Sequence, residues 1–364
     1  MTKSVLRRVS RLLLVYSMAV ANLVALTILW LVCLSTRVSP VEHPYIALAG
    51  LAFPVVLLVN VLFVIPWLIV SRRWLLMPVI GIALCWSYVK DYFPVNFTER
   101  PDDGDYIKVL SFNVFNFNTT DDMNGFETAE YVVWSDADII CLQEYNAGCN
   151  AAREMEARLD SAGYEIVKGN MLLIAAKGQI ITTADYEGTP HEGNGILTAR
   201  VVMHSGDTIF ACTAHLESTG LSIEDRSAYQ EAIADKDRHK LKASGMTMLH
   251  KLAASSAERA RQAMLLDSVA VSAEIYPTIV CGDMNETPVS YVAQLLSRRL
   301  TNAYTESGNG IGVSFRGKAF PVRIDHIFVS DEFEPMYSYV DQKTKSSDHH
   351  PIVTFLRRVP NLSQ

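Results

Sequence analysis

The chain divides into an apolar N-terminal part and a longer part in which short apolar runs alternate with polar segments. Residues 12–34 and 45–70 each form a run without a charged side chain. A helix rises about 1.5 Å per residue, so each run is long enough to cross a bilayer core of about 30 Å. A third run, 74–89, is shorter and contains a proline and a glycine. The pattern predicts a membrane anchor with about three transmembrane helices in residues 1–93.

The basic residues around these runs predict how they are oriented. Four precede the first run, and Arg72 and Arg73 separate the second run from the third, whereas Arg37 between the first two runs is offset by Glu42. The positive-inside rule then places the N-terminus in the cytoplasm and everything from residue 95 onward outside. This is typical of a bacterial inner-membrane protein with a periplasmic domain. A cleaved signal peptide at the first run is the alternative, although the other two runs would still insert.

The rest of the chain predicts a polar linker at 94–105 and a folded domain at 106–357. Strands and helices do not alternate strictly, which favours stacked sheets with flanking helices. A capping box at Ser255 and Glu258 predicts the start of a helix that ends near residue 273, and Asn150 is expected to cap another. The expected strands are 106–115, 138–143, 164–168, 171–176, 179–183, 195–203, 208–214, 277–281, 324–329 and 351–356, and the other expected helices are 127–135 and 150–161.

Charge and cysteine content narrow the class of protein. Residues 100–364 contain 24 Lys/Arg and 36 Asp/Glu, a net charge of −12. That balance argues against broad electrostatic binding of nucleic acid. The six cysteines are too few for a disulfide scaffold, and no pair has zinc-knuckle spacing. They are expected to be core thiols, with a Cys141–Cys149 bridge left open.

Polar side chains recur where the expected strands of the folded domain end. A fold built on sheets commonly assembles a site from such positions, so these side chains are expected to converge. The set holds several carboxylates and no cysteine, which suits a hard cation such as Mg²⁺ better than zinc. Its members are Asn113, Glu144, His215, Asp283, Asn285, Asp325, Asp348 and His349.

Six motifs at these positions resemble the endonuclease/exonuclease/phosphatase superfamily. That superfamily includes pancreatic-type deoxyribonuclease, abasic-site endonuclease, neutral sphingomyelinase and inositol-polyphosphate 5-phosphatase. The resemblance implies an α/β fold, a four-layer sandwich of two mixed β-sheets flanked by helices, here preceded by about three transmembrane helices. The motifs follow the family's order: SFNV at 111–114, LQE at 142–144, AHLES at 214–218, GDMNETP at 282–288, RIDHI at 323–327 and SDHHPI at 347–352.

The resemblance also implies a metal site. Glu144 would be the principal ligand of Mg²⁺, with Mn²⁺ as the alternative, because an ionised carboxylate supplies hard oxygen atoms. Asn113 would support the metal or a phosphate oxygen with its neutral amide. Asp348 would add a second carboxylate on the metal side.

Five further residues are assigned catalytic roles by the same resemblance. Asp283 would orient and deprotonate the attacking water. Asn285, expected to point the same way two residues further along the strand, would bind the nucleophile or the phosphate. His349 would donate to phosphate oxygens, with Asp325 fixing its tautomer, and His215 would be the second histidine donor.

Three residues beside the motifs are expected to be structural. His326 and His350 should point to the opposite faces of their strands from the motif residues, as packing or surface histidines. Arg259 lies three residues before Gln262 on one helix face and is expected to anchor the helix, with a phosphate contact as the alternative.

The leading functional hypothesis is a membrane-anchored, Mg²⁺-dependent phosphoesterase that hydrolyses a phosphodiester or phosphomonoester by metal-activated water. Its expected partner is a phosphate ester close to the bilayer, such as a lipid headgroup, with no obligate nucleic-acid partner and no protein partner indicated. An extracytoplasmic endonuclease or exonuclease acting on DNA or RNA is the alternative, disfavoured by the charge of −12. A non-catalytic scaffold is the third; it would be expected to have lost Glu144, Asp283 or His349, and all three are present.

Overall fold

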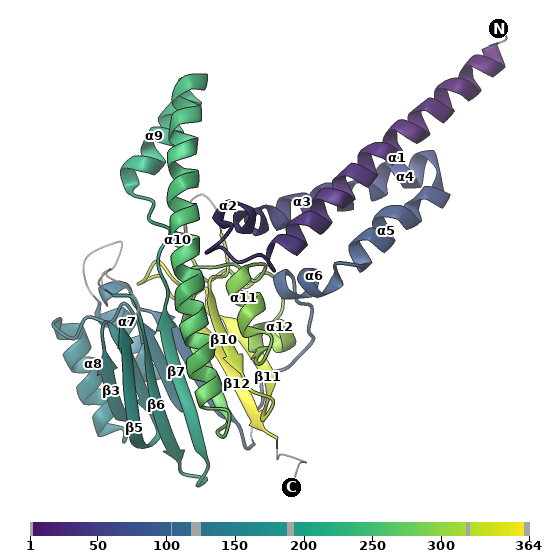
Figure 1. Ribbon diagram of the computed structural model, residues 1–364. Helices are drawn as coiled ribbons and strands as arrows, with labels where there is room; N and C mark the ends of the chain where they lie inside the picture. The colour runs from purple at the N-terminus through teal and green to yellow at the C-terminus, as the bar shows by residue number, and fades with distance from the viewer. Residues whose placement is uncertain (1–2, 103, 118–124, 188–192, 318–320, 360–364) are drawn as a thin grey trace.

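Two six-stranded β-sheets lie face to face in the C-terminal two thirds of the chain, and a group of apolar helices projects from one side (Figure 1). The computed structural model describes residues 3–102, 104–117, 125–187, 193–317 and 321–359. The predicted four-layer α/β sandwich is confirmed, because helices cover the outer face of each sheet.

The first sheet has the strand order β11-β12-β1-β2-β4-β3 and is mixed, since β1 and β2 run parallel while the other neighbours run antiparallel. Its central strands are buried on both faces, which explains why they read as continuous apolar runs. The strands are β1 (Ile107–Asn113), β2 (Ile139–Gln143), β3 (Glu165–Gly169), β4 (Leu172–Ala176), β11 (Phe333–Val340) and β12 (Ile352–Arg358).

The second sheet has the order β5-β6-β7-β8-β10-β9 and is also mixed, with one parallel pair, β7 and β8. Its strands are β5 (Gly178–Glu187), β6 (Gly195–Met203), β7 (Thr208–His215), β8 (Thr278–Asp283), β9 (Thr301–Asn302) and β10 (Asp325–Val329).

Helices pack on both outer faces of this pair of sheets. The central core lies between the sheets, a second apolar cluster joins the first sheet to α7 and α8, and a third joins the second sheet to α10 and α11. The helices of this part are α7 (Phe126–Trp134), α8 (Asn150–Ser161), α9 (Ile223–Ala234), α10 (Arg238–Ser272), α11 (Tyr291–Leu296) and α12 (Ala303–Ser307), with a 3-10 turn η3 (Phe115–Phe117).

Two helix starts differ from the sequence prediction. Ser255 lies inside α10, which begins at Arg238 with Asp237 as its cap, so the predicted capping box is wrong. Residues 238–254 extend the helix toward its N-terminus and pack on α9. Helix α9 itself begins with a capping box formed by Ser222 and Asp225. The cap of α8 is Cys149 rather than Asn150.

Strand β11 was not predicted from the sequence. It is an edge strand that is only partly buried, and its register shifts beside Pro335. Proline and partial burial both weaken the periodic signal of a strand, and both are typical of a sheet edge.

The N-terminal part consists of apolar helices. Two stretches are long and apolar enough to cross a membrane, Arg7–Ser35 and Pro44–Val70, which supports membrane association. The third expected span is broken into two helical segments, Arg72–Ala83 and Trp86–Tyr92, which are bent by 66° relative to each other. The chain has a third candidate span only if these two segments cross the membrane together. The elements are α1 (Lys3–Ser35), α2 (Pro44–Ala47), η1 (Leu48–Ala52), α3 (Phe53–Leu62), α4 (Val64–Val70), η2 (Arg72–Leu75), α5 (Leu76–Ala83) and α6 (Trp86–Tyr92).

Buried amide side chains join the apolar helices to one another. The Trp67 Nε1–H donates to Asn22 Oδ1 at 3.0 Å, and Asn60 Nδ2 donates to the Ala25 carbonyl at 3.1 Å. Polar side chains that pair across helices are a common means of holding helices together in a lipid environment.

The apolar helices contact the sandwich directly. Val289, a few residues beyond β8, is fully buried in the same apolar cluster as Leu29 and Phe53. A side chain at Gly50 would lie 2.5 Å from the Val289 carbonyl oxygen, so the two backbones meet closely there. Lys90 pairs with Glu306 of α12 at 2.7 Å on the other side of this junction. The sandwich is therefore held against the apolar helices by backbone contact as well as by side chains.

Candidate active site

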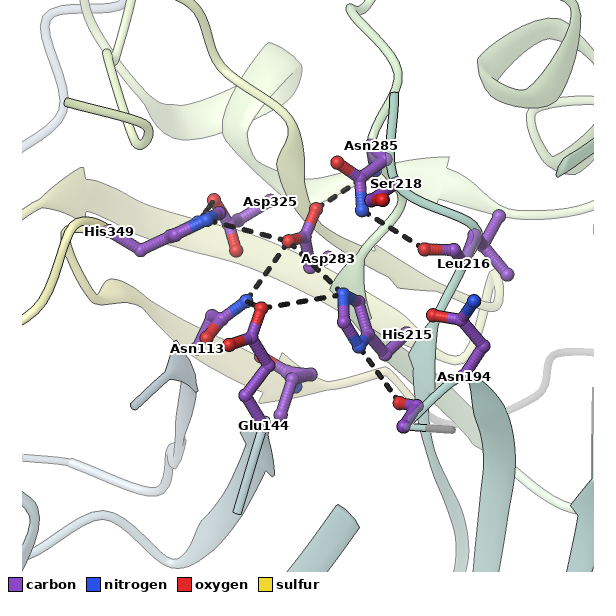
Figure 2. A network of polar contacts seen from close by, with 12 residues as sticks. Asn113, Glu144, Asn194, His215, Leu216, Ser218, Asp283, Asn285, Asp325 and His349 are labelled. Carbon is purple, nitrogen blue, oxygen red and sulfur yellow. Dashed lines mark hydrogen bonds and ion pairs between the residues drawn. The ribbon is translucent and has the colours of Figure 1, made fainter. Parts of the chain in front are cut away.

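The predicted site residues converge because the strands that carry them end at the same edge of the two sheets. In the second sheet, His215 on β7 is aligned with Asp283 on the parallel strand β8. Asp325 begins β10, which is antiparallel to β8 and places it opposite Asp283. In the first sheet, Asn113 ends β1 and Glu144 follows β2. Figure 2 shows these side chains pointing toward one another from both sheets.

Asp283 lies at the centre of this network. Its Oδ1 accepts the backbone N–H of Asn285 at 2.9 Å, and its Oδ2 accepts Asn113 Nδ2 at 3.1 Å. The Nε2 atoms of His215 and His349 lie 3.7 and 3.6 Å from the same Oδ2. Burial raises the pKa of Asp283, the charge of Asp325 adds to that rise, and the two histidines oppose it. A raised pKa makes this carboxylate a better proton acceptor than an exposed aspartate.

His349 is held by Asp325. Its Nδ1 lies 2.9 Å from Asp325 Oδ2, and both side chains are almost completely buried. Burial alone would favour the neutral imidazole, but the charges of Asp325 and Asp283 outweigh it and raise the pKa of His349 to about 10. The ring is therefore an imidazolium at neutral pH, with Nδ1–H bound to Asp325 and Nε2–H directed toward Asp283.

Glu144 faces the same centre from the first sheet. Asn113 Nδ2 donates to Glu144 Oε1 at 3.0 Å, and His215 Nε2 lies 3.8 Å from that oxygen. The other ring nitrogen of His215 is 3.0 Å from the Gly193 carbonyl oxygen, which fixes the ring plane. Because Asn113 Oδ1 accepts the Phe115 N–H at 3.0 Å, its amide nitrogen faces the carboxylates. Asn113 thus donates to two carboxylates, and its predicted support of the metal or of a phosphate oxygen stays a prediction.

The orientation predicted for Asn285 rested on strand alternation, while its role toward the nucleophile or phosphate stays a prediction. Strand β8 ends at Asp283, so strand alternation does not extend to Asn285, and the reason given for its orientation is wrong. Its backbone has a φ of 49°, and its Nδ2 donates to the Leu216 carbonyl at 3.0 Å. Asn285 touches Asp283 through its main-chain N–H, while its side chain ties the loop after β8 to the end of β7.

Two of the site residues adopt a backbone conformation that is uncommon outside glycine. Glu144 has a φ of 50°, close to that of Asn285. Such conformations cost about 1–3 kcal/mol each and are concentrated at functional sites. Glu144 follows β2 directly and Asn285 lies two residues beyond β8, where the chain turns at the edge of the sheets.

The carboxylates at this edge fit a divalent cation. Asp348 Oδ1 is buried without a hydrogen-bond partner among the described residues, and burial together with the charges of Glu144 and Asp283 raises the pKa of this carboxyl. Asp283, Asp325 and His349 also bring ligand atoms within 4.8 Å of one another. His349 is a poor ligand in that triplet, because its Nδ1 is bound to Asp325 and its high pKa keeps the ring protonated. Glu144 and Asp348 remain the predicted ligands, and their charges interact closely enough to affect the pKa of Asp348.

Several supporting residues escaped prediction. Ser347 Oγ donates to the Asn113 carbonyl at 2.8 Å and accepts the His349 N–H at 3.1 Å, so it ties the final turn to β1. Ser347 is the first residue of the SDHHPI motif, and its hydroxyl two residues before His349 could have suggested this supporting role. Ser314 Oγ accepts the backbone N–H of Asp325 at 3.1 Å, and nothing in its local sequence marks it.

The three residues expected to be structural lie outside the reacting centre. Arg259 is buried, with Nε donating to Glu286 Oε1 at 2.8 Å and Nη1 donating to the Glu217 carbonyl at 3.0 Å, so it anchors α10 to the loop after β8. His326 Nε2 lies 3.0 Å from the Glu286 carbonyl, and burial beside Arg323 lowers its pKa to about 3. His350 is buried, with Nδ1 3.0 Å from a backbone carbonyl.

Sequence comparison assigns most of the chain to two families. Residues 110–349 match the Endonuclease/Exonuclease/phosphatase family. Residues 11–92 match a family described as a domain of unknown function (DUF8431). No curated protein sequence matches the chain significantly.

Solved structures show the same fold. An endonuclease/exonuclease/phosphatase from Beutenbergia cavernae is 13% identical with a TM-score of 0.52, covering 70% of this chain and 72% of its own. A family protein from Bacteroides thetaiotaomicron is 19% identical with a TM-score of 0.50, covering 70% and 98%. A mannosyl-6-phosphatase from the same organism is 18% identical with a TM-score of 0.50, covering 69% and 99%.

Proposed function

The chain belongs to the endonuclease/exonuclease/phosphatase family, and on that premise we propose that it is a membrane-anchored hydrolase that uses Mg²⁺ to cleave a phosphate ester. The observation that carries the proposal is the contact pattern of Asp283. One carboxylate oxygen faces Asn113, His215 and His349 at 3.1 to 3.7 Å. This pattern supports a role for Asp283 as a base beside two histidines and an amide donor.

Each residue has a task in the hydrolysis of a phosphate ester. Asp283 would accept a proton from the attacking water, a role favoured by its raised pKa. His349, protonated and held through Nδ1 by Asp325, would donate Nε2–H to a phosphoryl oxygen as negative charge builds up there. Glu144 and Asp348 would hold the cation. When bound, the cation supplies positive charge that offsets the charge of the phosphoryl group.

We propose a substrate close to the bilayer, with a lipid headgroup as the first choice. Val289, packed among the apolar helices, is only six residues from Asp283. Six extended residues span at most about 21 Å, so the catalytic carboxylate lies within that distance of the apolar helix cluster. The net charge of −12 over residues 100–364 does not suit a long polyanion such as DNA.

The proposal is tested with the full chain in detergent micelles that contain the candidate substrate. Hydrolysis is measured with Mg²⁺, with Mn²⁺ and with EDTA, as inorganic phosphate released from monoesters and as the alcohol, headgroup or nucleotide fragment released from diesters. The substrates are phospholipids, bis-p-nitrophenyl phosphate, p-nitrophenyl phosphate, mannose 6-phosphate and single-stranded DNA. We expect metal-dependent turnover of an ester, with phospholipid preferred, and its loss in Asp283→Asn. Glu258→Gln, which changes an exposed pair of α10, is the matched control.

The pattern of substrates decides between the alternatives. Preferred cleavage of DNA would favour an extracytoplasmic nuclease, and turnover of mannose 6-phosphate would favour a sugar phosphatase. No turnover of any ester with either metal would contradict the proposal and leave a non-catalytic scaffold.

A further inference from the structure

A pair of helices extends away from the sandwich next to its junction with the apolar helices. Figure 1 shows α9 and the N-terminal half of α10 rising beyond the sheets, at an angle to α1. The C-terminal half of α10 is buried on the second sheet, whereas residues 238–250 have no sheet beneath them. This part of α10 therefore has a surface that the packing of the sandwich does not explain.

The outer half of α10 has two different sides. One side packs on α9: a side chain at Gly245 would lie 3.8 Å from the Tyr229 ring, and Lys251 pairs with Asp225 at 2.5 Å. The other side contacts α2, where His250 Nδ1 lies 2.6 Å from the Tyr45 hydroxyl. Tyr45 is the second residue of Pro44–Val70, one of the two apolar stretches that could cross a membrane.

The side that carries His250 is exposed and amphipathic. Residues three, four, seven and eight apart lie on one face of a helix. Met246 and Leu249 on this face are 44% and 38% exposed, and Lys242 and His239 are exposed one and two turns before them. We call His239, Lys242, Met246, Leu249 and His250 the outer face of α10.

The N-terminal part of α10 and the residues just before it are positively charged, although the domain that contains them is negatively charged. Residues 236–251 contain five Lys/Arg and one Asp, a net charge of +4, within a part of the chain whose net charge is −12. Lys240 pairs with Asp235 beside α9, at 3.4 Å. Among the described residues no carboxylate pairs with Lys242, which lies on the outer face.

We propose that the outer face of α10 lies on the anionic phospholipid surface of the bilayer that holds the apolar helices. Lys242 and neighbouring Arg238 would face lipid phosphates, while Met246 and Leu249 enter the headgroup boundary. The contact with Tyr45 places this face next to a candidate membrane helix, and its charge matches acidic lipids. The inference rests on the membrane anchoring in the proposed function and adds a second, peripheral contact with the same bilayer.

The test measures the depth of single labels in the full chain reconstituted into vesicles. Cys149 is the half-buried cysteine and the other five are buried, so a Cys149→Ser background limits unwanted labelling, and serine keeps the helix cap. A fluorophore is attached at Met246→Cys on the outer face or at Glu231→Cys, exposed on α9. Leu58→Cys, 56% exposed on α3, reports whether the anchor is inserted. Vesicles contain phosphatidylcholine with or without phosphatidylglycerol, and doxyl-labelled lipids quench the fluorophore.

We expect strong quenching at position 58 in both lipids. Quenching at position 246 should exceed that at 231 in phosphatidylglycerol, and it should fall at least about twofold without that lipid or with Arg238→Glu and Lys242→Glu together. Equal quenching at 246 and 231, with 58 quenched, would overturn the surface contact and leave the anchoring intact. Quenching at position 246 that does not depend on lipid charge would also overturn it. Disulfide cross-linking between two copies of the unlabelled Met246→Cys protein would overturn it as well. An unquenched position 58 would overturn the anchoring and this inference together.

Discussion

The Nδ1 atom of His349 lies 2.9 Å from the Oδ2 atom of Asp325, although 24 residues separate the two in the chain. The start of β10 supplies one residue and the turn before β12 supplies the other. Both are buried, so the ion pair has little solvent screening. Asp325 therefore sets both the orientation and the protonation of the ring.

This pair should behave as one unit in catalysis. Asp325→Asn and His349→Ala are each expected to lower kcat by about 100-fold or more, because each leaves the phosphoryl oxygens without an oriented donor. The double variant should fall within about threefold of the worse single variant. Steady-state kinetics on all four proteins, with melting temperatures as the folding control, measure this. If the losses in log kcat of the two single variants add up to the loss in the double variant, the residues act independently.

The raised pKa of His349 also predicts a pH dependence of stability. A histidine whose pKa is higher in the folded state contributes stability below its ordinary pKa of 6.5, and that contribution disappears as the pH rises through about 10. The free energy of unfolding of the metal-free protein should therefore fall between these two values. Asp325→Asn removes the main cause of the shift, so its curve should be flatter over the same range. Parallel curves for the two proteins would contradict the assigned pKa.

The sequence predicted most of the strands and the residues at their ends, because polar side chains interrupt apolar runs there. It could not predict that Asn113 would bridge Glu144 and Asp283, since that contact joins two sheets across 170 residues. Strand alternation also failed to predict the orientation of Asn285, because strand β8 ends before it and its backbone is left-handed. The capping box of α9 was missed because its third helical position is Asp225 and not the usual glutamate or glutamine.

Catalysis should require a divalent metal near Glu144. Glu144→Gln keeps the shape of the side chain and its contact with Asn113 but removes the charge, so kcat should fall at least about 100-fold. Calorimetric titration of Mg²⁺ should show weaker binding in this variant than in the wild type. Activity that persists in EDTA, or a variant near wild type, would contradict the metal site.

Gly282 should tolerate no side chain. Its φ is 149°, and a Cβ would lie 1.9 Å from the Ala214 carbonyl oxygen on the neighbouring strand. Gly282→Ala is expected to lower the free energy of unfolding by at least about 3 kcal/mol. Gly206→Ala is the control, because its φ of 91° is also positive but nothing lies within 4 Å, and about 1 kcal/mol is expected there. Similar melting temperatures for the two variants would contradict the steric argument.

The orientation of the anchor can be tested with fusions. The basic residues before α1 and at Arg72–Arg73 predict a cytoplasmic N-terminus and an external sandwich. An alkaline phosphatase fusion after residue 110 should be active, and a reporter that fluoresces only in the cytoplasm should stay dark. The reverse result would mean that the bent pair α5–α6 does not cross.

The pairing of β12 with β1 has a consequence for synthesis of the chain. Strand β1 lies between β12 and β2, so its β12 edge stays open until residues 352–358 have been made. His349 and Asp348 also arrive with that last segment. A chain that has not yet reached this segment therefore carries Asp283 and Glu144 but lacks two residues of the proposed site. The same delay leaves an unpaired strand edge open to proteases and to aggregation until the last strand has been made.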